Sequence, residues 1–226
     1  MQKEILEYAD FRKEKTKERI SLLLSDGDTS MVARKALSYY FGETPKSFQQ
    51  YYVETIANRD DFLSSTDFFR VFKRKYSLQG IDNGFLDALE KEKSAILQCI
   101  DSNELSRLYF SFFAFAQLQH GDGIVTKDLG SFFAKLVHTF CPDKFCALDN
   151  PIKNYFRLGR ESFFVAFMII SQAYQEWVEK NPALMRQIRD ELEKNSIAKS
   201  YSAKMTNLKL LDLIFWYQAN RAAKYG

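Results

Sequence analysis

Proline and glycine are scarce in this sequence: its 226 residues include four prolines and nine glycines. Sheets of short strands need frequent turns, and turns depend heavily on these two residue types. Long stretches without either favour helices, whose interiors both residues disrupt. The scarcity therefore predicts an all-α fold, and 21 phenylalanines and 12 tyrosines provide large apolar side chains for its core.

Apolar residues at helical spacing predict a single compact domain of about ten helices. The expected segments are residues 3–24, 31–41, 45–57, 66–76, 85–100, 104–118, 127–140, a short helix after Asn150, 160–180, a helix from Pro182, and 207–223. Segment 104–118 is apolar on most sides, so it is expected to be the central core helix. A division into two lobes, as in some helical enzymes, would fall near residues 120–126.

Residues that favour helix starts fix several of these boundaries. Ser65 or Thr66 is expected to cap segment 66–76, and Thr126 to cap segment 127–140. Asn150 is expected to cap a short helix whose first residue is Pro151, because a missing N–H costs least at that position.

Cysteine usage and apolar runs suggest a compartment. The three cysteines form no disulfide pattern, and the N-terminal stretch lacks the apolar core of a signal peptide. The longest apolar run, residues 163–170, is far shorter than the roughly 20 residues that cross a bilayer. We therefore expect a cytoplasmic protein without a membrane partner, with this run in a buried helix.

Positive charge is concentrated near the C-terminus. The net charge of +3 is too small to identify a nucleic-acid-binding protein. Residues 194–226, however, contain six basic residues against one acid, Asp212. If lysines such as Lys204 and Lys209 cluster in the fold, they would attract a phosphate backbone. The alternative is that they are scattered over a solvated helix.

Two patterns bear a partial likeness to metal sites. Aligning the stretch HGDGIVTKDL with a calcium-binding loop puts Leu118 and Leu129 at the first and last ligand positions, where oxygen ligands are required. His138, Cys141, Cys146 and Asp149 lack the paired spacing of zinc sites. No metal is therefore predicted. Phosphate-binding, dinucleotide-binding and hydrolase motifs are not found either, so no cofactor is predicted.

The stretch GSFFAKLVHTFCPDKFCALDNPIKNYF, residues 130–156, resembles bacterial proteins with the fold of the helix-hairpin-helix DNA glycosylases, particularly the 8-oxoguanine glycosylases. In that pattern a helix bearing a lysine runs into a proline turn, and an aspartate then starts the next helix. Lys135, Pro142 and Asp149 match these positions. The segment NLKLLDLIFWYQ, residues 207–218, is similar to the closing helix of such proteins. These segments cover about a fifth of the chain.

The resemblance implies double-stranded DNA as partner and a base-excision N-glycosylase or lyase activity, with Lys135 and Asp149 as catalytic residues. Lys127 competes for the lysine role, because the family's lysine follows its hairpin directly and GDG stands here in place of the hairpin's LPGVG. DNA binding would then involve Lys127, Lys153, Lys204 and Lys209.

Two other interpretations need no enzyme. Asp149 can be only a helix cap, and Lys135 can lie along the surface with its stem over apolar neighbours. The chain as a whole can be a helical protein-interaction module that keeps a glycosylase-like core for packing.

Overall fold

The computed structural model describes residues 2–42 and 47–225, and helices make up most of them, as the sequence predicts. The expected helix start at Pro45 lies outside the described residues. The elements in chain order are α1 (Gln2–Leu23), α2 (Thr29–Tyr40), α3 (Ser47–Thr55), α4 (Arg59–Ser64), α5 (Phe68–Lys75), α6 (Asn83–Lys91), α7 (Lys93–Asp101), α8 (Leu105–Phe112), β1 (Ala116–His120), β2 (Gly123–Lys127), α9 (Gly130–Phe140), α10 (Asn150–Tyr155), α11 (Phe163–Lys180), α12 (Pro182–Lys194), the 3-10 helix η1 (Ala198–Lys204) and α13 (Asn207–Tyr225).

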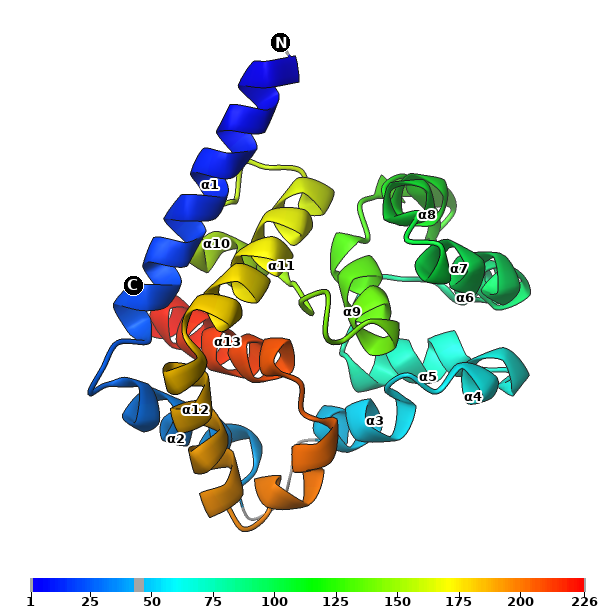
Figure 1. Ribbon diagram of the computed structural model, residues 1–226. Helices are drawn as coiled ribbons and strands as arrows, with labels where there is room; N and C mark the ends of the chain where they lie inside the picture. Colours follow the sequence, from blue (N-terminus) through cyan, green and yellow to red (C-terminus); the bar gives the residue numbers. More distant parts are fainter. Residues whose placement is uncertain (1, 43–46, 226) are drawn as a thin grey trace.

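The helices form two groups that lie side by side (Figure 1). The terminal group contains α1, α2, α10 to α13 and η1, and the middle group contains α3 to α8 with the two strands. The chain passes between the groups from α2 to α3 and from α9 to α10. Residues 120–126, where a lobe boundary was expected, lie within the middle group instead.

Helix α9 packs against both groups. The ring of Phe132 stacks on Phe72 of α5, with centroids 5.3 Å apart, and Phe133 meets Phe167 of α11 at 5.2 Å. At its first residue, Gly130, a Cβ atom would lie 2.1 Å from a ring carbon of Phe163, so only glycine permits this close contact with α11. The central helix is therefore α9, and not segment 104–118 as expected.

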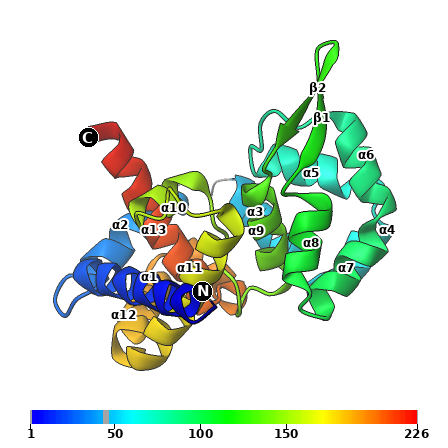
Figure 2. The ribbon, with the colours of Figure 1, turned by 90° about the horizontal axis from the view of Figure 1, so that it is seen from above.

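Segment 104–118 is not one helix. Helix α8 ends at Phe112, and residues 116–127 form an antiparallel hairpin in which Leu118 pairs with Val125. Gly121 supplies the positive φ of the turn, and the Leu118 side chain is fully buried. The hairpin projects from the middle group (Figure 2). Thr126 thus lies in a strand and does not cap a helix; the sequence-based expectation was wrong there.

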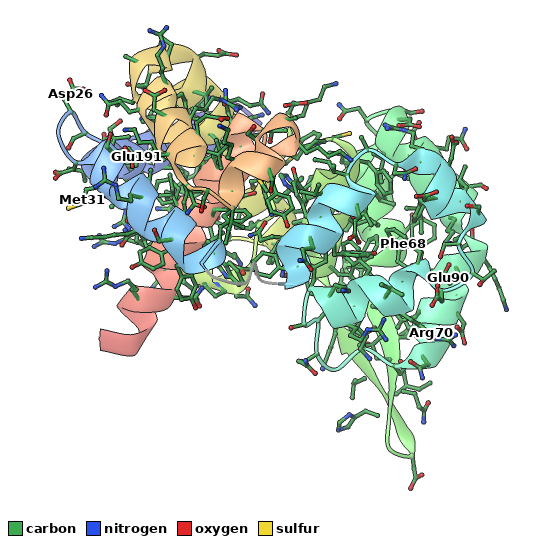
Figure 3. All side chains as sticks on the ribbon, turned by 90° about the horizontal axis from the view of Figure 1, so that it is seen from below. Asp26, Met31, Phe68, Arg70, Glu90 and Glu191 are labelled. Atoms are coloured by element: carbon green, nitrogen blue, oxygen red, sulfur yellow. The ribbon has the colours of Figure 1, made fainter. Side chains whose placement is uncertain are left out.

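The N-terminus of α5 is capped from outside its own segment. Neither Ser65 nor Thr66 caps it, and its N-cap residue, Asp67, makes no side-chain capping bond. Instead the Phe69 backbone N–H donates to Glu90 Oε1 of α6 at 2.6 Å (Figure 3 labels Phe68 and Glu90). The expected helix 85–100 is divided at Glu92 into α6 and α7, so α6 can turn back toward α5.

Charged contacts on the outside complete the terminal group. Glu191 of α12, labelled in Figure 3, accepts from the Arg34 Nε of α2 at 2.8 Å. Residues 163–170 fall in α11 with most side chains buried, as expected. Within residues 2–42 and 47–225, no helix combines the length and apolar character that a membrane span needs.

Candidate functional site

Lys135 and Asp149 lie in the wall of one cavity between the two groups of helices. The cavity has a volume of about 180 Å³. Its walls are largely apolar and include Phe48, Tyr76 and Trp216, which come from α3, the end of α5, and α13. A lysine of α9 and a carboxylate at the start of α10 therefore line one largely apolar cavity.

Asp149 is held by the start of α10. Its Oδ1 accepts from the Ile152 backbone N–H at 3.1 Å, so Asp149 is the N-cap and not Asn150 as expected. Burial raises the pKa of this carboxyl, while the Lys135 ammonium and the hydrogen bond from Ile152 oppose the rise. Capping and a place in the cavity wall are thus compatible roles for one side chain.

Lys135 lies in the second turn of α9, and its Nζ donates to Ser131 Oγ at 3.1 Å. Burial lowers the pKa of the amine, and the Asp149 and Asp212 carboxylates oppose this effect. The lysine is therefore more readily deprotonated than one in water, and it does not lie along the outer surface.

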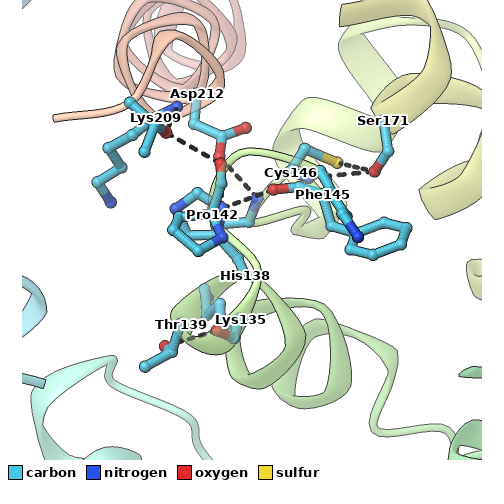
Figure 4. A network of polar contacts seen from close by, with 12 residues as sticks. Lys135, His138, Thr139, Pro142, Phe145, Cys146, Ser171, Lys209 and Asp212 are labelled. Carbon is cyan, nitrogen blue, oxygen red and sulfur yellow. Dashed lines mark hydrogen bonds and ion pairs between the residues drawn. The ribbon is translucent and has the colours of Figure 1, made fainter. Parts of the chain in front are cut away.

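A second charged pair lines the same cavity from α13. The side chains of Lys209 and Asp212 are 3% and 4% exposed, and Asp212 Oδ2 accepts from the Ala147 backbone N–H at 2.6 Å. Burial raises the pKa of Asp212 to about 7 and lowers that of Lys209 to about 8. The opposite charge on each residue acts against the pKa shift of the other. Figure 4 shows Lys209 and Asp212 on α13, above the α9 side chains.

His138 of α9 belongs to the same network (Figure 4). Its Nδ1 lies 2.6 Å from the Phe145 carbonyl oxygen and 3.9 Å from Asp212 Oδ2. Burial lowers its pKa to about 3, so the ring is neutral and its Nδ1–H donates to Phe145. The contact with Asp212 is therefore not an ion pair. The ring also stacks on Tyr52, with centroids 5.4 Å apart.

A larger open cavity of about 500 Å³ adjoins the first. Lys135 and Asp149 line both, so they lie where the two meet. Lys127 and Lys153 line only the larger cavity. Lys153 Nζ donates to the Glu161 carbonyl oxygen at 2.6 Å, and Lys127 Nζ lies 3.4 Å from that of Gly80. Both of these lysines, which were predicted to bind DNA, therefore lie in the wall of the larger, open cavity.

The other two lysines predicted for DNA binding are placed differently. Lys204 lines neither cavity; it is exposed on η1 and donates to the Val53 carbonyl oxygen at 2.8 Å. Lys209 is buried, so it cannot lie along a phosphate backbone as expected. The C-terminal basic residues therefore do not form one surface cluster that includes Lys209.

Lys127 does not start a helix. It ends β2, and α9 begins three residues later at Gly130, with Ser131 in its first turn. The amine that shares the smaller cavity with Asp149 is that of Lys135, because Lys127 lines only the larger one.

Sequence reasoning missed Asp212 and Trp216 as cavity residues and Lys75 at the rim. One signal was present: segment 207–218 is apolar on more than one face, so Lys209 and Asp212 within it had no polar face to occupy.

Among the described residues, no group of three or more histidine, cysteine or acidic side chains could hold a metal ion. The Cys146 thiol, for example, accepts a hydrogen bond from the Ser171 hydroxyl group at 3.3 Å.

Comparisons with protein-family models, with curated proteins and with solved structures found no match for this chain.

Proposed function

We propose that this protein binds duplex DNA and excises a damaged base as an N-glycosylase with lyase activity. The observation that supports the proposal best is that Lys135 and Asp149 line both cavities where these meet. A glycosylase needs an amine or activated water beside a carboxylate, in a pocket that admits an extruded nucleotide. The larger cavity would admit the nucleotide, and the smaller one continues from it between aromatic walls.

In the proposed reaction, the neutral Lys135 amine attacks C1′ of the extruded sugar, and the bond to the base breaks. The base leaves with the bonding electron pair, and the Asp149 carboxylate stabilises the positive charge that develops on the sugar. Loss of the ammonium proton and opening of the sugar ring then give an imine between Lys135 and C1′. Burial favours the first step because it lowers the pKa of Lys135.

Positive charge at the entrance supports DNA as the partner. Five lysines line the two cavities, against three aspartates: Lys75, Lys127, Lys135, Lys153 and Lys209, with Asp128, Asp149 and Asp212. Lys127 is exposed and Lys75 is partly exposed, so these two can meet phosphates, whereas Lys153 is buried and its ammonium is held by the Glu161 carbonyl oxygen. Phosphate contacts weaken as salt rises, and because they are few here, we expect a moderate affinity that falls with salt.

Borohydride trapping tests the enzymatic part. The wild-type protein should form a covalent adduct with duplex DNA that carries an abasic site or 8-oxoguanine, because reduction fixes the imine. Lys135→Met should abolish the adduct, and Asp149→Asn should slow base release. Lys204→Met is the matched control, since Lys204 is an exposed lysine outside both cavities; its adduct yield should equal that of the wild type.

A non-enzymatic interaction module is the second candidate. Phe115 and Ile124 are each 68% exposed and Phe110 is 55% exposed, all in α8 or the hairpin region. Exposed apolar groups of this size often mark contacts with other proteins. No adduct on any lesion of a panel, together with no salt-sensitive binding to duplex DNA, would favour this candidate over the glycosylase.

A further inference from the structure

Lys209 is a buried lysine without a structural partner of the usual kind. Its ammonium lies 4.2 Å from the centre of the Tyr52 ring and 5.9 Å from that of Phe48. Both contacts are with ring faces, whereas a structural buried lysine such as Lys93 donates to a carbonyl oxygen and pairs with Glu90 Oε2 at 2.6 Å. Lys209 therefore keeps its donors and its lone pair for a molecule in the cavity.

The surroundings make this amine easy to deprotonate. Burial lowers its pKa to about 8, while Asp212 and the Tyr52 ring favour the ammonium and Lys135 disfavours it. The titratable or charged groups that line the cavity or contact this site from the packed elements are Tyr52, Lys75, Tyr76, Lys135, His138, Asp149 and Asp212.

The size and walls of the smaller cavity restrict what can reach Lys209. A cavity of about 150 Å³ lined by apolar side chains holds one benzene molecule. The cavity here measures about 180 Å³ and is bounded by Phe48, Leu213 and Trp216. It therefore suits a flat molecule with one ring. The larger cavity shares Ser77, Lys135 and Asp149 with it, so the two adjoin at these residues.

We propose that Lys209 is a second reactive amine of this protein, which forms a Schiff base with small single-ring aldehydes that enter the smaller cavity. The neutral amine attacks the carbonyl carbon to give a carbinolamine, after its ammonium proton has passed to solvent. The carbinolamine then loses its hydroxyl group with one proton as water, and the C=N bond forms. The inference does not depend on DNA binding or on Lys135 as a nucleophile.

Reductive labelling tests the proposal on the intact wild-type protein. Benzaldehyde and cyanoborohydride are applied at about pH 7, and the modified lysines are located by peptide mass spectrometry. An amine of pKa about 8 is roughly 10% neutral at that pH, against well below 1% for an ordinary lysine. The neutral fractions differ by more than about a hundredfold, so Lys209 should be labelled at least about tenfold faster than the exposed Lys199, even though a less basic amine is a weaker nucleophile. Its labelling rate should level off above about pH 8.

Probe size and variants sharpen the test. Pyrenecarboxaldehyde is too large for the cavity, so it should label Lys199 but not Lys209. Lys209→Arg keeps the positive charge over Tyr52 and removes the amine, and it should eliminate the fast site; Lys204→Arg should not. Labelling of Lys209 no faster than Lys199, or fast labelling at Lys135 instead, would overturn the proposal. DNA trapping through Lys135 is unaffected by either outcome, so the two proposals fail separately.

Discussion

Lysine and carboxylate side chains meet in two regions of this molecule, and the two regions treat their charges in opposite ways. On the outside of the terminal group, Glu176 of α11 lies 2.9 Å from Lys13 Nζ and 2.5 Å from Lys17 Nζ of α1. In the cavity between the groups, Lys209 and Asp212 lie on one helix and are almost completely buried.

The pKa shifts differ in sign between these regions. Hydrogen bonds with the two lysines lower the pKa of Glu176, and the pKa of Lys17 is raised, so both groups are held in their charged forms. Burial shifts Asp212 and Lys209 toward their neutral forms. The difference shows that an opposite charge nearby does not by itself keep a group in its charged form. Where a lysine and a carboxylate are not hydrogen-bonded to each other, the cost of removing them from water exceeds their attraction.

The largest effect on stability is expected from breaking the buried pair. Asp212→Ala leaves the Ala147 backbone N–H without its acceptor and removes the negative charge that favours the Lys209 ammonium, which should lower the free energy of unfolding by about 3 kcal/mol. Urea unfolding measures this loss. Asp212→Asn keeps an acceptor for Ala147 and should cost clearly less. Asp190→Ala, at an exposed position of α12, should change stability by no more than about 0.5 kcal/mol. A loss equally small at Asp212 would show that this buried carboxylate stabilises neither Ala147 nor the Lys209 ammonium.

The second prediction uses pH to separate the two regions. Because the folded-state pKa of Asp212 is raised from 3.8 to about 7, its contribution to stability falls as pH rises through that window. Because the folded-state pKa of Lys209 is lowered from 10.5 to about 8, its contribution recovers between those values. The cavity therefore adds a minimum of stability between about pH 7 and 8. The contribution of Glu176 and Lys17 to stability is constant over this pH range and is lost only in strong acid or base.

Lys209→Met combined with Asp212→Asn should remove the minimum. The double variant should gain stability over the wild type most strongly at about pH 7.5 and least at about pH 5 and pH 10. His138 also titrates with folding, and the Lys209 charge contributes to its lowered pKa of about 3. That value lies well below all three pH values, so the ring is neutral throughout and contributes little to the difference. Denaturant unfolding at the three pH values measures the curve. A difference that does not vary with pH would show that these two groups do not carry shifted pKa values.

Local patterns predicted the helices better than the hairpin. The helices expected at 160–180 and 207–223 correspond to α11 and α13, because apolar residues at helical spacing dominate both segments. Strand β1 reads AQLQH, whose residues are good helix formers, so nothing local separates it from α8. The strand forms because it pairs with β2 and buries Leu118, and both interactions involve residues outside the segment.

The candidate site likewise has one part that the sequence predicted and one part that it did not. The resemblance led to Lys135 and Asp149, and the chain carries both on one continuous junction from α9 to α10. Asp212 and Trp216 enter the cavity only because α13 packs beside α10. Lys209 was expected to contact phosphate from the surface, although segment 207–218 is apolar on more than one face and leaves it no polar face. The polar half of the site is therefore a product of tertiary packing.

The smallest effect is expected at the outer pair, and it completes the comparison. Glu176→Gln removes two ion pairs in which the carboxylate is 33% exposed and the Lys13 and Lys17 side chains are 17% and 11% exposed. Because the carboxylate itself stays in contact with water, the free energy of unfolding should fall by about 1 kcal/mol or less. The loss should shrink further as salt is raised from low to physiological concentration, because solvent ions screen exposed charges. Glu179→Gln, at an exposed position on the same helix, is the control and should be nearly neutral. A loss at Glu176 as large as that at Asp212 would mean that burial does not distinguish the two regions. A loss that does not change with salt would show that the ion pairs between Glu176 and α1 are shielded from solvent ions, as the charges in the cavity are.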